Sequence, residues 1–125
     1  MPTDTWHAYA AAWTAPTEQR RALLERHVSP QVAYRDPVTE VRGRDELAGY
    51  MHDFGQGFPG HRFAIVAVDA HHGRSLAHWQ LRGPDDVAVQ AGISHAVHDA
   101  QHRLTDITGF FATPAAGPGS GVGAG

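Results

Sequence analysis

Residues 87–112, VAVQAGISHAVHDAQHRLTDITGFFA, decide the fold of this chain. Residues 87–98 and 103–112 are rich in Val, Ile and Phe, as strands are, and the polar DAQHR between them is typical of a turn. Successive strand residues point to opposite faces, so Gln90, Gly92, Ser94, Ala96 and His98 share one face. If this small and more polar face points inward, it leaves room for a ligand beside a few hydrogen-bonding groups.

Upstream of this hairpin, the pattern predicts two more long strands and three helices. The strands are expected over 61–70 and 75–82, separated from each other and from 87–98 by the turn-prone HHGR and GPDD. Apolar spacing and breakers predict helices over 5–14, 17–28 and 43–54. Short extended segments are expected at 32–36 and 38–41. Three helices in the N-terminal half followed by a strand meander predict an α+β domain with helices on one sheet face.

Composition restricts the class of protein further. The chain has 125 residues, 42% of them hydrophobic, which suits one globular domain, expected over 1–113. Residues 114–125, PAAGPGSGVGAG, are expected to form a disordered tail. The longest apolar run, 63–68, is too short to span a membrane, and we see no secretory signal, so a cytoplasmic location is expected. All ten basic residues are Arg and there is no Asn, a usage associated with GC-rich bacterial genomes.

Charge and potential ligands argue against several partners. A net charge of −3 provides no strongly basic surface for binding nucleic acid or an anionic membrane. Without cysteine the chain has no thiolate metal site. His95, His98 and His102 have the best metal-ligand spacing, but strand alternation sends the first two to opposite faces. We therefore expect neither a metal nor a cofactor. His78 is expected on the outer face because its neighbour Trp79 is costlier to expose; the rival placement puts His78 inward beside an acid.

Three segments together resemble a known superfamily. VAYRDPV (32–38), VRGRDELAGY (41–50) and GISHAVHDAQHRLTDITGFF (92–111) are similar in order and spacing to the nuclear-transport-factor-2-like superfamily. Within it, the chain resembles the SnoaL-like polyketide cyclase and ketosteroid isomerase branch, over about 5–112. The resemblance implies a cone-shaped, curved, mostly antiparallel sheet wrapped around the three helices, with a central hydrophobic pocket. It also implies a homodimer formed through the outer sheet face.

The resemblance assigns roles to individual residues. Asp36, before Pro37, falls where the isomerases have their general base, and Tyr9 falls near an oxyanion donor on the first helix. Tyr50 and Phe111 fall on aromatics of the pocket wall. Ser94 falls where the isomerases have an oxyanion-hole Asp. A serine hydroxyl is a weaker donor than a protonated carboxyl, so we expect a proton transfer other than steroid isomerisation.

The remaining candidates are expected to line the pocket wall. Several of the candidate residues also have a purely structural interpretation. We expect the pocket also to be lined by Trp13, Tyr34, Phe54, Trp79, Gln90 and His98. Asp36 could equally cap the turn at Pro37, and Tyr9 and Tyr34 could be ordinary core residues. The sequence thus favours a cofactor-free isomerase, cyclase or dehydratase, with Asp36 as base, acting on a small apolar carbonyl-bearing molecule. The alternative is a non-catalytic small-molecule-binding or dimerisation module of the same fold.

Overall fold

The computed structural model describes residues 2–112, which form three helices and one sheet. The helices are α1 (Pro2–Ala12), α2 (Thr17–His27) and α3 (Gly43–Gly57). The strands are β1 (Val28–Asp36), β2 (Thr39–Arg42), β3 (Arg62–His71), β4 (Arg74–Arg82), β5 (Ala88–His98) and β6 (Leu104–Phe111). The predicted tail, 114–125, lies outside the described residues.

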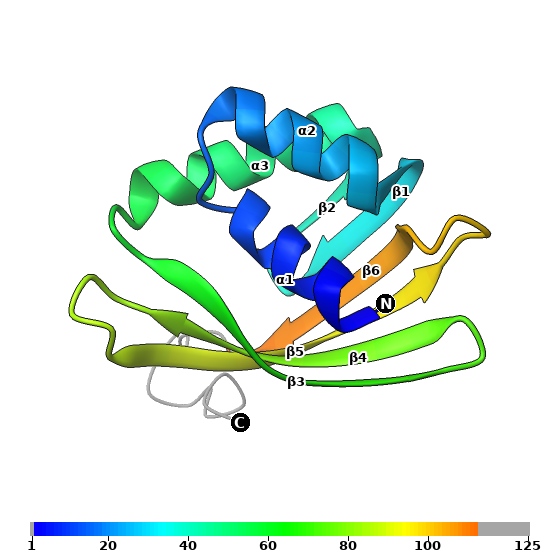
Figure 1. Cartoon of the computed structure of the whole chain (residues 1–125). Helices are drawn as coiled ribbons and strands as arrows, with labels where there is room; N and C mark the ends of the chain where they lie inside the picture. Colours follow the sequence, from blue (N-terminus) through cyan, green and yellow to red (C-terminus); the bar gives the residue numbers. More distant parts are fainter. Residues whose placement is uncertain (1, 113–125) are drawn as a thin grey trace.

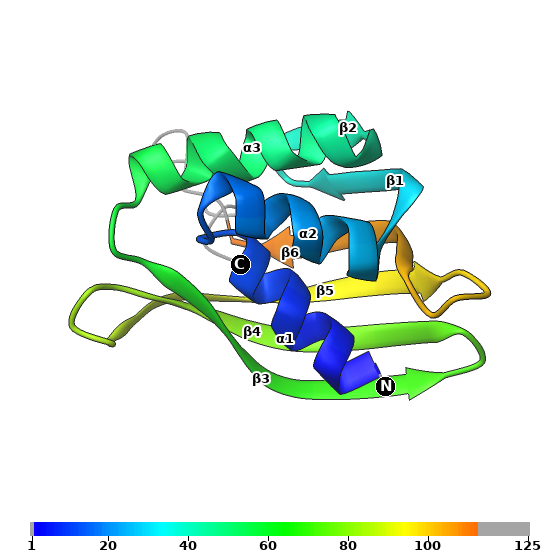
Figure 2. The same cartoon turned by 45° about the horizontal axis from the view of Figure 1, so that its top comes forward.

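The six strands form one curved sheet beneath the helices (Figure 1). Their order is β2-β1-β6-β5-β4-β3, and every pairing is antiparallel except that of β1 with β6. Helix α1 packs against β3 and α2, while α3 packs against β1, so all three helices lie on the same face of the sheet (Figure 2). The predicted α+β class, with a mostly antiparallel sheet curved around three helices, is confirmed.

Several element boundaries differ from the prediction, and two of the differences involve proline and glycine. The first strand begins at Val28 and includes Pro30, which was expected only to end the preceding helix. Proline is tolerated there because the pairing of β1 with β6 shifts between Val28 and Ala33. Helix α3 continues through Gly55 to Gly57 instead of ending at Phe54. A glycine costs a helix only about 1 kcal/mol relative to alanine, so two glycines did not stop it.

The core fills the space between the helices and the concave face of the sheet. Leu47 and Met51, one helical turn apart on α3, are fully buried, as are Leu104 and Ile107 on β6. The predicted strand faces are confirmed. Ser94 is buried, and so are the other inward residues Ala77, Trp79, Leu81 and Ala96, whereas Val89 and Ile93 are exposed.

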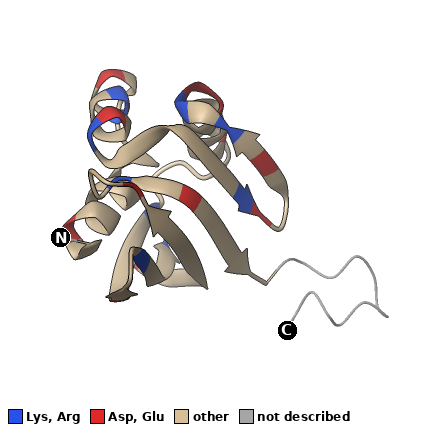
Figure 3. Cartoon of the chain, turned by 90° about the vertical axis from the view of Figure 1, so that its right-hand side faces the viewer, with Lys and Arg blue, Asp and Glu red and all other residues tan. Residues whose placement is uncertain are grey.

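Charged residues lie mainly outside this core. Figure 3 shows acidic and basic residues interspersed along α2 and α3. Arg44, near the start of α3, donates hydrogen bonds to the carbonyl oxygens of Val28 (2.9 Å) and Glu25 (3.0 Å) and so ties α3 to the end of α2. None of the three helices within residues 2–112 is long and apolar enough to cross a membrane.

Candidate functional site

A cavity of about 350 Å³ opens between the helices and the concave face of the sheet. Its size lies at the lower end of the range for small-molecule sites. Every predicted site residue except His98 lines it: Tyr9, Trp13, Tyr34, Asp36, Tyr50, Phe54, Trp79, Gln90, Ser94 and Phe111. The structure therefore brings together residues from α1, α3 and four strands on one largely aromatic wall.

Trp13 lies at the centre of the aromatic wall. Its ring centroid is 5.4–5.8 Å from those of four other aromatic residues: Tyr34, Tyr50, Phe54 and Phe63. Most of these pairs are edge-to-face, the arrangement that the ring quadrupole favours. The wall is thus a packed aromatic cluster, in which Trp13, directly after α1, and rings on α3, β1 and β3 hold one another in place.

Asp36 ends β1 with both carboxylate oxygens occupied. Oδ1 accepts hydrogen bonds from the backbone amides of Val38 (2.8 Å) and Thr39 (3.1 Å), which form the turn into β2. Oδ2 accepts hydrogen bonds from the phenols of Tyr34 (2.6 Å) and Tyr50 (2.9 Å), which both line the cavity. One oxygen therefore caps the turn at Pro37, as one interpretation predicted, and the other oxygen contacts two phenols that line the cavity.

The phenols of Tyr34 and Tyr50 stay protonated as donors to that carboxylate. Burial raises the pKa of Tyr34 far above its usual value, with further contributions from neighbouring Tyr9 and from the hydrogen bond to Asp36. Burial also raises the pKa of Tyr50, and the hydrogen bond to Asp36 adds to the rise. A phenol that donates to an anion resists ionisation, because its own negative charge would face the carboxylate.

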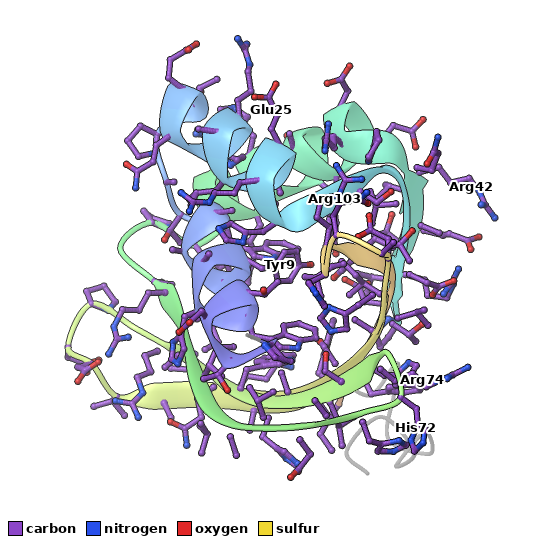
Figure 4. All side chains as sticks on the ribbon, turned by 45° about the vertical axis from the view of Figure 1, so that its right-hand side comes forward. Tyr9, Glu25, Arg42, His72, Arg74 and Arg103 are labelled. Carbon is purple, nitrogen blue, oxygen red and sulfur yellow. The ribbon has the colours of Figure 1, made fainter. Side chains whose placement is uncertain are left out.

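Tyr9 supplies a second polar group from α1. Figure 4 shows its side chain pointing from α1 into the interior, and it is 5% exposed. Within residues 2–112, its hydroxyl oxygen makes no hydrogen bond. Burial raises its pKa, the charge of Asp36 adds to the rise, and the nearby Trp13 side chain partly offsets it without forming a well-aligned bond. A buried phenol without a hydrogen-bond partner lowers the stability of the fold, and a ligand atom that accepts a hydrogen bond from it would remove that cost.

Ser94 and Gln90 project from β5 on the same face. The Ser94 hydroxyl accepts a hydrogen bond from the indole N–H of Trp79 (3.0 Å). The Gln90 amide lies farther out, where its nitrogen donates to the carbonyl oxygen of Ala112 (2.9 Å). Ser94 is therefore a deep polar group of the cavity, and Gln90 lies toward its edge.

The histidines lie away from the cavity. His98 has the predicted inward parity, but it hydrogen-bonds to Ser75 (2.6 Å) and to the carbonyl oxygen of His102 (3.1 Å) and is not among the cavity-lining residues. His78 lies on the opposite face of β4 from the cavity, as favoured, beside a depression on the outer surface. Across residues 2–112, no three His, Asp or Glu side chains are grouped as a metal site would require.

Sequence reasoning missed several wall residues. Trp6, Phe58, Phe63, Ile65 and Leu81 also line the cavity. Trp6 lies seven residues before Trp13, a spacing typical of helical core packing, and it is both packed and part of the wall. Strand alternation could have placed Phe63 and Ile65 together on the inner face, since Leu81 and Trp79 pair opposite them.

Comparisons with known proteins agree with this architecture. The family model for the SnoaL-like domain matches residues 6–112. A protein from Agrobacterium tumefaciens, provisionally named an isomerase of the SnoaL-like family, is 27% identical, with a TM-score of 0.82 over 87% of this chain and 95% of that one. No curated protein matches the sequence significantly.

Two more distant structures share the fold. A protein from Methylobium petroleophilum with a cystatin-like fold is 18% identical, with a TM-score of 0.72 over 94% of this chain and 79% of that one. A protein from Jannaschia, provisionally named a SnoaL-like polyketide cyclase, is 13% identical, with a TM-score of 0.71 over 88% and 84%. With its match to the family model over 6–112, the chain belongs to the SnoaL-like domain family.

Proposed function

We propose that this protein catalyses cofactor-free proton transfer on a small apolar molecule that carries a carbonyl group. The observation that carries the proposal is the meeting of one carboxylate, Asp36, with two hydroxyls, Tyr9 and Ser94, in one aromatic cavity of about 350 Å³. Aromatic walls suit an apolar ligand, and the hydroxyls suit a ligand oxygen. The isomerase name of the Agrobacterium protein, 27% identical, supports the same kind of reaction.

In this proposal, Asp36 removes a proton from the carbon next to the carbonyl group. The C–H electron pair forms an enolate, and the proton moves to Oδ2. Returning the proton at another carbon shifts a double bond, whereas attack by the carbanion on an electrophilic carbon closes a ring. A positioned general base contributes about 10²–10⁴ in rate. Tyr9 and Ser94 would hydrogen-bond the enolate oxygen, and one such donor contributes about 10²–10³.

One hydrogen bond to Asp36 must open before Oδ2 can take a proton. A carboxylate has about four lone-pair sites, and four donors occupy those of Asp36. Tyr50 is the donor that we expect to move. Its bond to Oδ2, 2.9 Å, is longer than that of Tyr34, 2.6 Å, and Tyr50 is only partly buried. The released phenol could then donate to the ligand oxygen.

The test is hydrogen–deuterium exchange on β-tetralone, an apolar bicyclic ketone with acidic protons beside its carbonyl. The native protein in deuterium oxide should accelerate exchange at those carbons, as followed by proton NMR. Asp36→Asn should slow this exchange by about 10²-fold or more, because an amide is no base at neutral pH. Ser29→Ala, a change on β1 outside the cavity lining, serves as the control. Equal rates for native protein and Asp36→Asn would refute the assignment of the base.

A second candidate function is a non-catalytic binding module. The four hydrogen bonds to Asp36 favour it, because a carboxylate whose lone pairs are all occupied by donors is a structural anchor and leaves no site for a substrate proton. In this case the native protein would bind β-tetralone, seen as quenching of tryptophan fluorescence, without accelerating exchange. The two candidates therefore give opposite results in one experiment.

We also propose that the outer sheet face pairs with a second copy of the chain. A shallow depression there is lined by His78, Gln80 and apolar residues, of which Val66 and Phe110 are 59% and 61% exposed. Phe110→Glu should convert a dimer into a monomer in sedimentation velocity. Val87→Glu, an exposed valine outside the depression, should not. A native protein that sediments as a monomer would refute the dimer.

A further inference from the structure

The hydrogen bond between Trp79 and Ser94 fixes the direction of a hydroxyl deep in the cavity. An indole N–H can only donate, so Ser94 Oγ is the acceptor in this 3.0 Å bond. Both side chains are buried, with 9% and 8% of their surface exposed. Ser94 Oγ makes no other hydrogen bond to any residue of 2–112. Its own hydrogen is therefore available to a ligand.

The Trp79 ring is held so that this bond cannot easily swing away. Gly92 faces Trp79 in the β4–β5 register, and a Cβ at position 92 would lie only 2.6 Å from Trp79 Cη2. The indole thus rests directly on the backbone of β5. Phe63 packs against it edge-to-face at 5.3 Å, and Phe111 does so at 6.1 Å. Three neighbours therefore fix the orientation of the indole N–H.

Gly109 lies between Ser94 and Asp36, and it has room for a single methyl group. Gly109 pairs with Ser94 across β5 and β6, and it also adjoins β1. A Cβ at position 109 would lie 3.4 Å from Ser94 Oγ and 3.6 Å from Asp36 Cβ. The φ angle of Gly109 is not positive, so its backbone conformation does not require glycine. The missing side chain leaves space flanked by the hydroxyl of one residue and the carboxyl-bearing side chain of the other.

We propose that Trp79 is the residue that positions and polarises the Ser94 hydroxyl, so that the hydrogen bond already proposed from Ser94 reaches a ligand carbonyl oxygen beside Gly109. A hydroxyl that accepts one hydrogen bond becomes a stronger donor, by roughly 10–30% per bond in condensed phase. The ligand class is an apolar ketone or its enolate, since a hydroxyl donor needs an acceptor and a ligand ammonium group would present only donors. This inference rests on the proposed function only in taking the cavity as a site for a carbonyl-bearing molecule.

The experiment compares two probes of nearly equal shape. β-Acetylnaphthalene, isotope-labelled at its carbonyl carbon, reports hydrogen bonding through the frequency of its carbonyl stretch. β-Ethylnaphthalene lacks the oxygen and reports only the apolar cavity. In native protein, the carbonyl stretch should lie below its value in hexane. With Ser94→Ala it should rise toward the hexane value, and the ketone should bind about fivefold more weakly relative to the hydrocarbon.

Two further variants separate positioning from the hydroxyl itself. Trp79→Phe keeps the Ser94 hydroxyl but removes its donor, so the carbonyl stretch should lie between the native and Ser94→Ala values. Gly109→Ala fills the space at Gly109 with a methyl group, so it should weaken the ketone and spare the hydrocarbon. Ser94→Thr, which keeps a hydroxyl at this position, should retain a lowered stretch, so it tests the hydroxyl separately from its indole donor.

Each outcome bears on the inference. A native carbonyl stretch equal to that of Ser94→Ala overturns the role of Ser94, and so does a native protein that binds the hydrocarbon but not the ketone. A Trp79→Phe stretch equal to the native one overturns the role of Trp79. If Asp36→Asn exchanges β-tetralone protons as fast as native protein while Ser94 still lowers the carbonyl stretch, the proposed catalysis fails and this inference stands.

Discussion

The indole N–H of Trp6 on α1 donates a 2.7 Å hydrogen bond to the hydroxyl oxygen of Ser75 on β4. The carbonyl oxygen of His102 can only accept, so a neutral His98 carries its hydrogen on Nδ1 and donates to that oxygen at 3.1 Å. Its Nε2 then accepts a hydrogen bond from the Ser75 hydroxyl, 2.6 Å away. The first helix is thereby anchored to two strands and the turn after β5, and this chain of bonds positions one wall of the cavity.

Replacing Ser75 with alanine should destabilise the fold by about 1–3 kcal/mol, because the indole N–H of Trp6 would be buried without an acceptor. The measurement is urea unfolding at neutral pH, followed by circular dichroism. Ser29→Ala serves as the control, since Ser29 is equally buried but accepts only a local bond from the Gln31 amide. A Ser75→Ala variant as stable as native protein would show that Trp6 finds another acceptor.

Sequence periodicity could predict the faces of the strands but not such long-range bonds. The alternation of 87–98 correctly placed Ser94 and Ala96 inward, because burial of one sheet face imposes a period of two. The alternation also correctly placed His98 on the same face of the strand as Ser94 and Ala96. It could not show that His98 bonds to Ser75, 23 residues away, because that contact depends on how β4 and β5 pair at their far end.

The same limit applies to Asp36. The Asp-Pro pair indicated a turn cap, and Oδ1 accepts hydrogen bonds from the turn amides. The resemblance indicated a general base, which stays a prediction; Oδ2 contacts the cavity-lining phenol of Tyr50. Strand alternation places Tyr34 on the same face of β1 as Asp36, whereas the approach of Tyr50 from α3 follows from tertiary packing. Element types were predictable from breakers and periodicity, whereas the extension of α3 to Gly57 was not.

The three tyrosines of the chain should all resist ionisation in the native state. Tyr9, Tyr34 and Tyr50 each have a pKa raised mainly by burial. The unfolded chain ionises its tyrosines near pH 10. The contribution of these groups to the free energy of unfolding is therefore fully present below that pH and is lost as the pH rises above it. Phenolate absorbance should therefore rise together with the loss of circular dichroism.

The control for that titration is the chain unfolded in guanidinium, whose phenols should ionise near pH 10. Phenolate absorbance that rises near pH 10 in a still-folded protein would contradict the burial of these groups. Tyr50 is the most exposed of the three and would be the first expected source of such absorbance. The variant Tyr50→Phe tests this, because it removes the phenol.

Tyr34→Phe should cost about 1.5–3 kcal/mol of stability, because it removes a 2.6 Å hydrogen bond to a charged group at a buried position. Tyr50→Phe should cost less, since its bond is 2.9 Å and water can reach the partly buried site and replace the phenol. Denaturant unfolding of both variants in one buffer gives the ranking. The reverse order would mean that Tyr50 is the principal anchor of Asp36, against its proposed release.

Gly92→Ala should destabilise the protein by about 1–3 kcal/mol or more, because the added methyl overlaps the Trp79 ring and lies 2.7 Å from the carbonyl oxygen of Phe110. Gly49→Ala is the matched control. It adds the same methyl on α3, where no atom lies within 4 Å, and should stabilise the helix by up to about 1 kcal/mol. The displaced indole should also change tryptophan fluorescence in Gly92→Ala only. Equal stability and spectra for the two variants would mean that Trp79 does not rest on Gly92, and the fixed direction of its N–H would be lost with that contact.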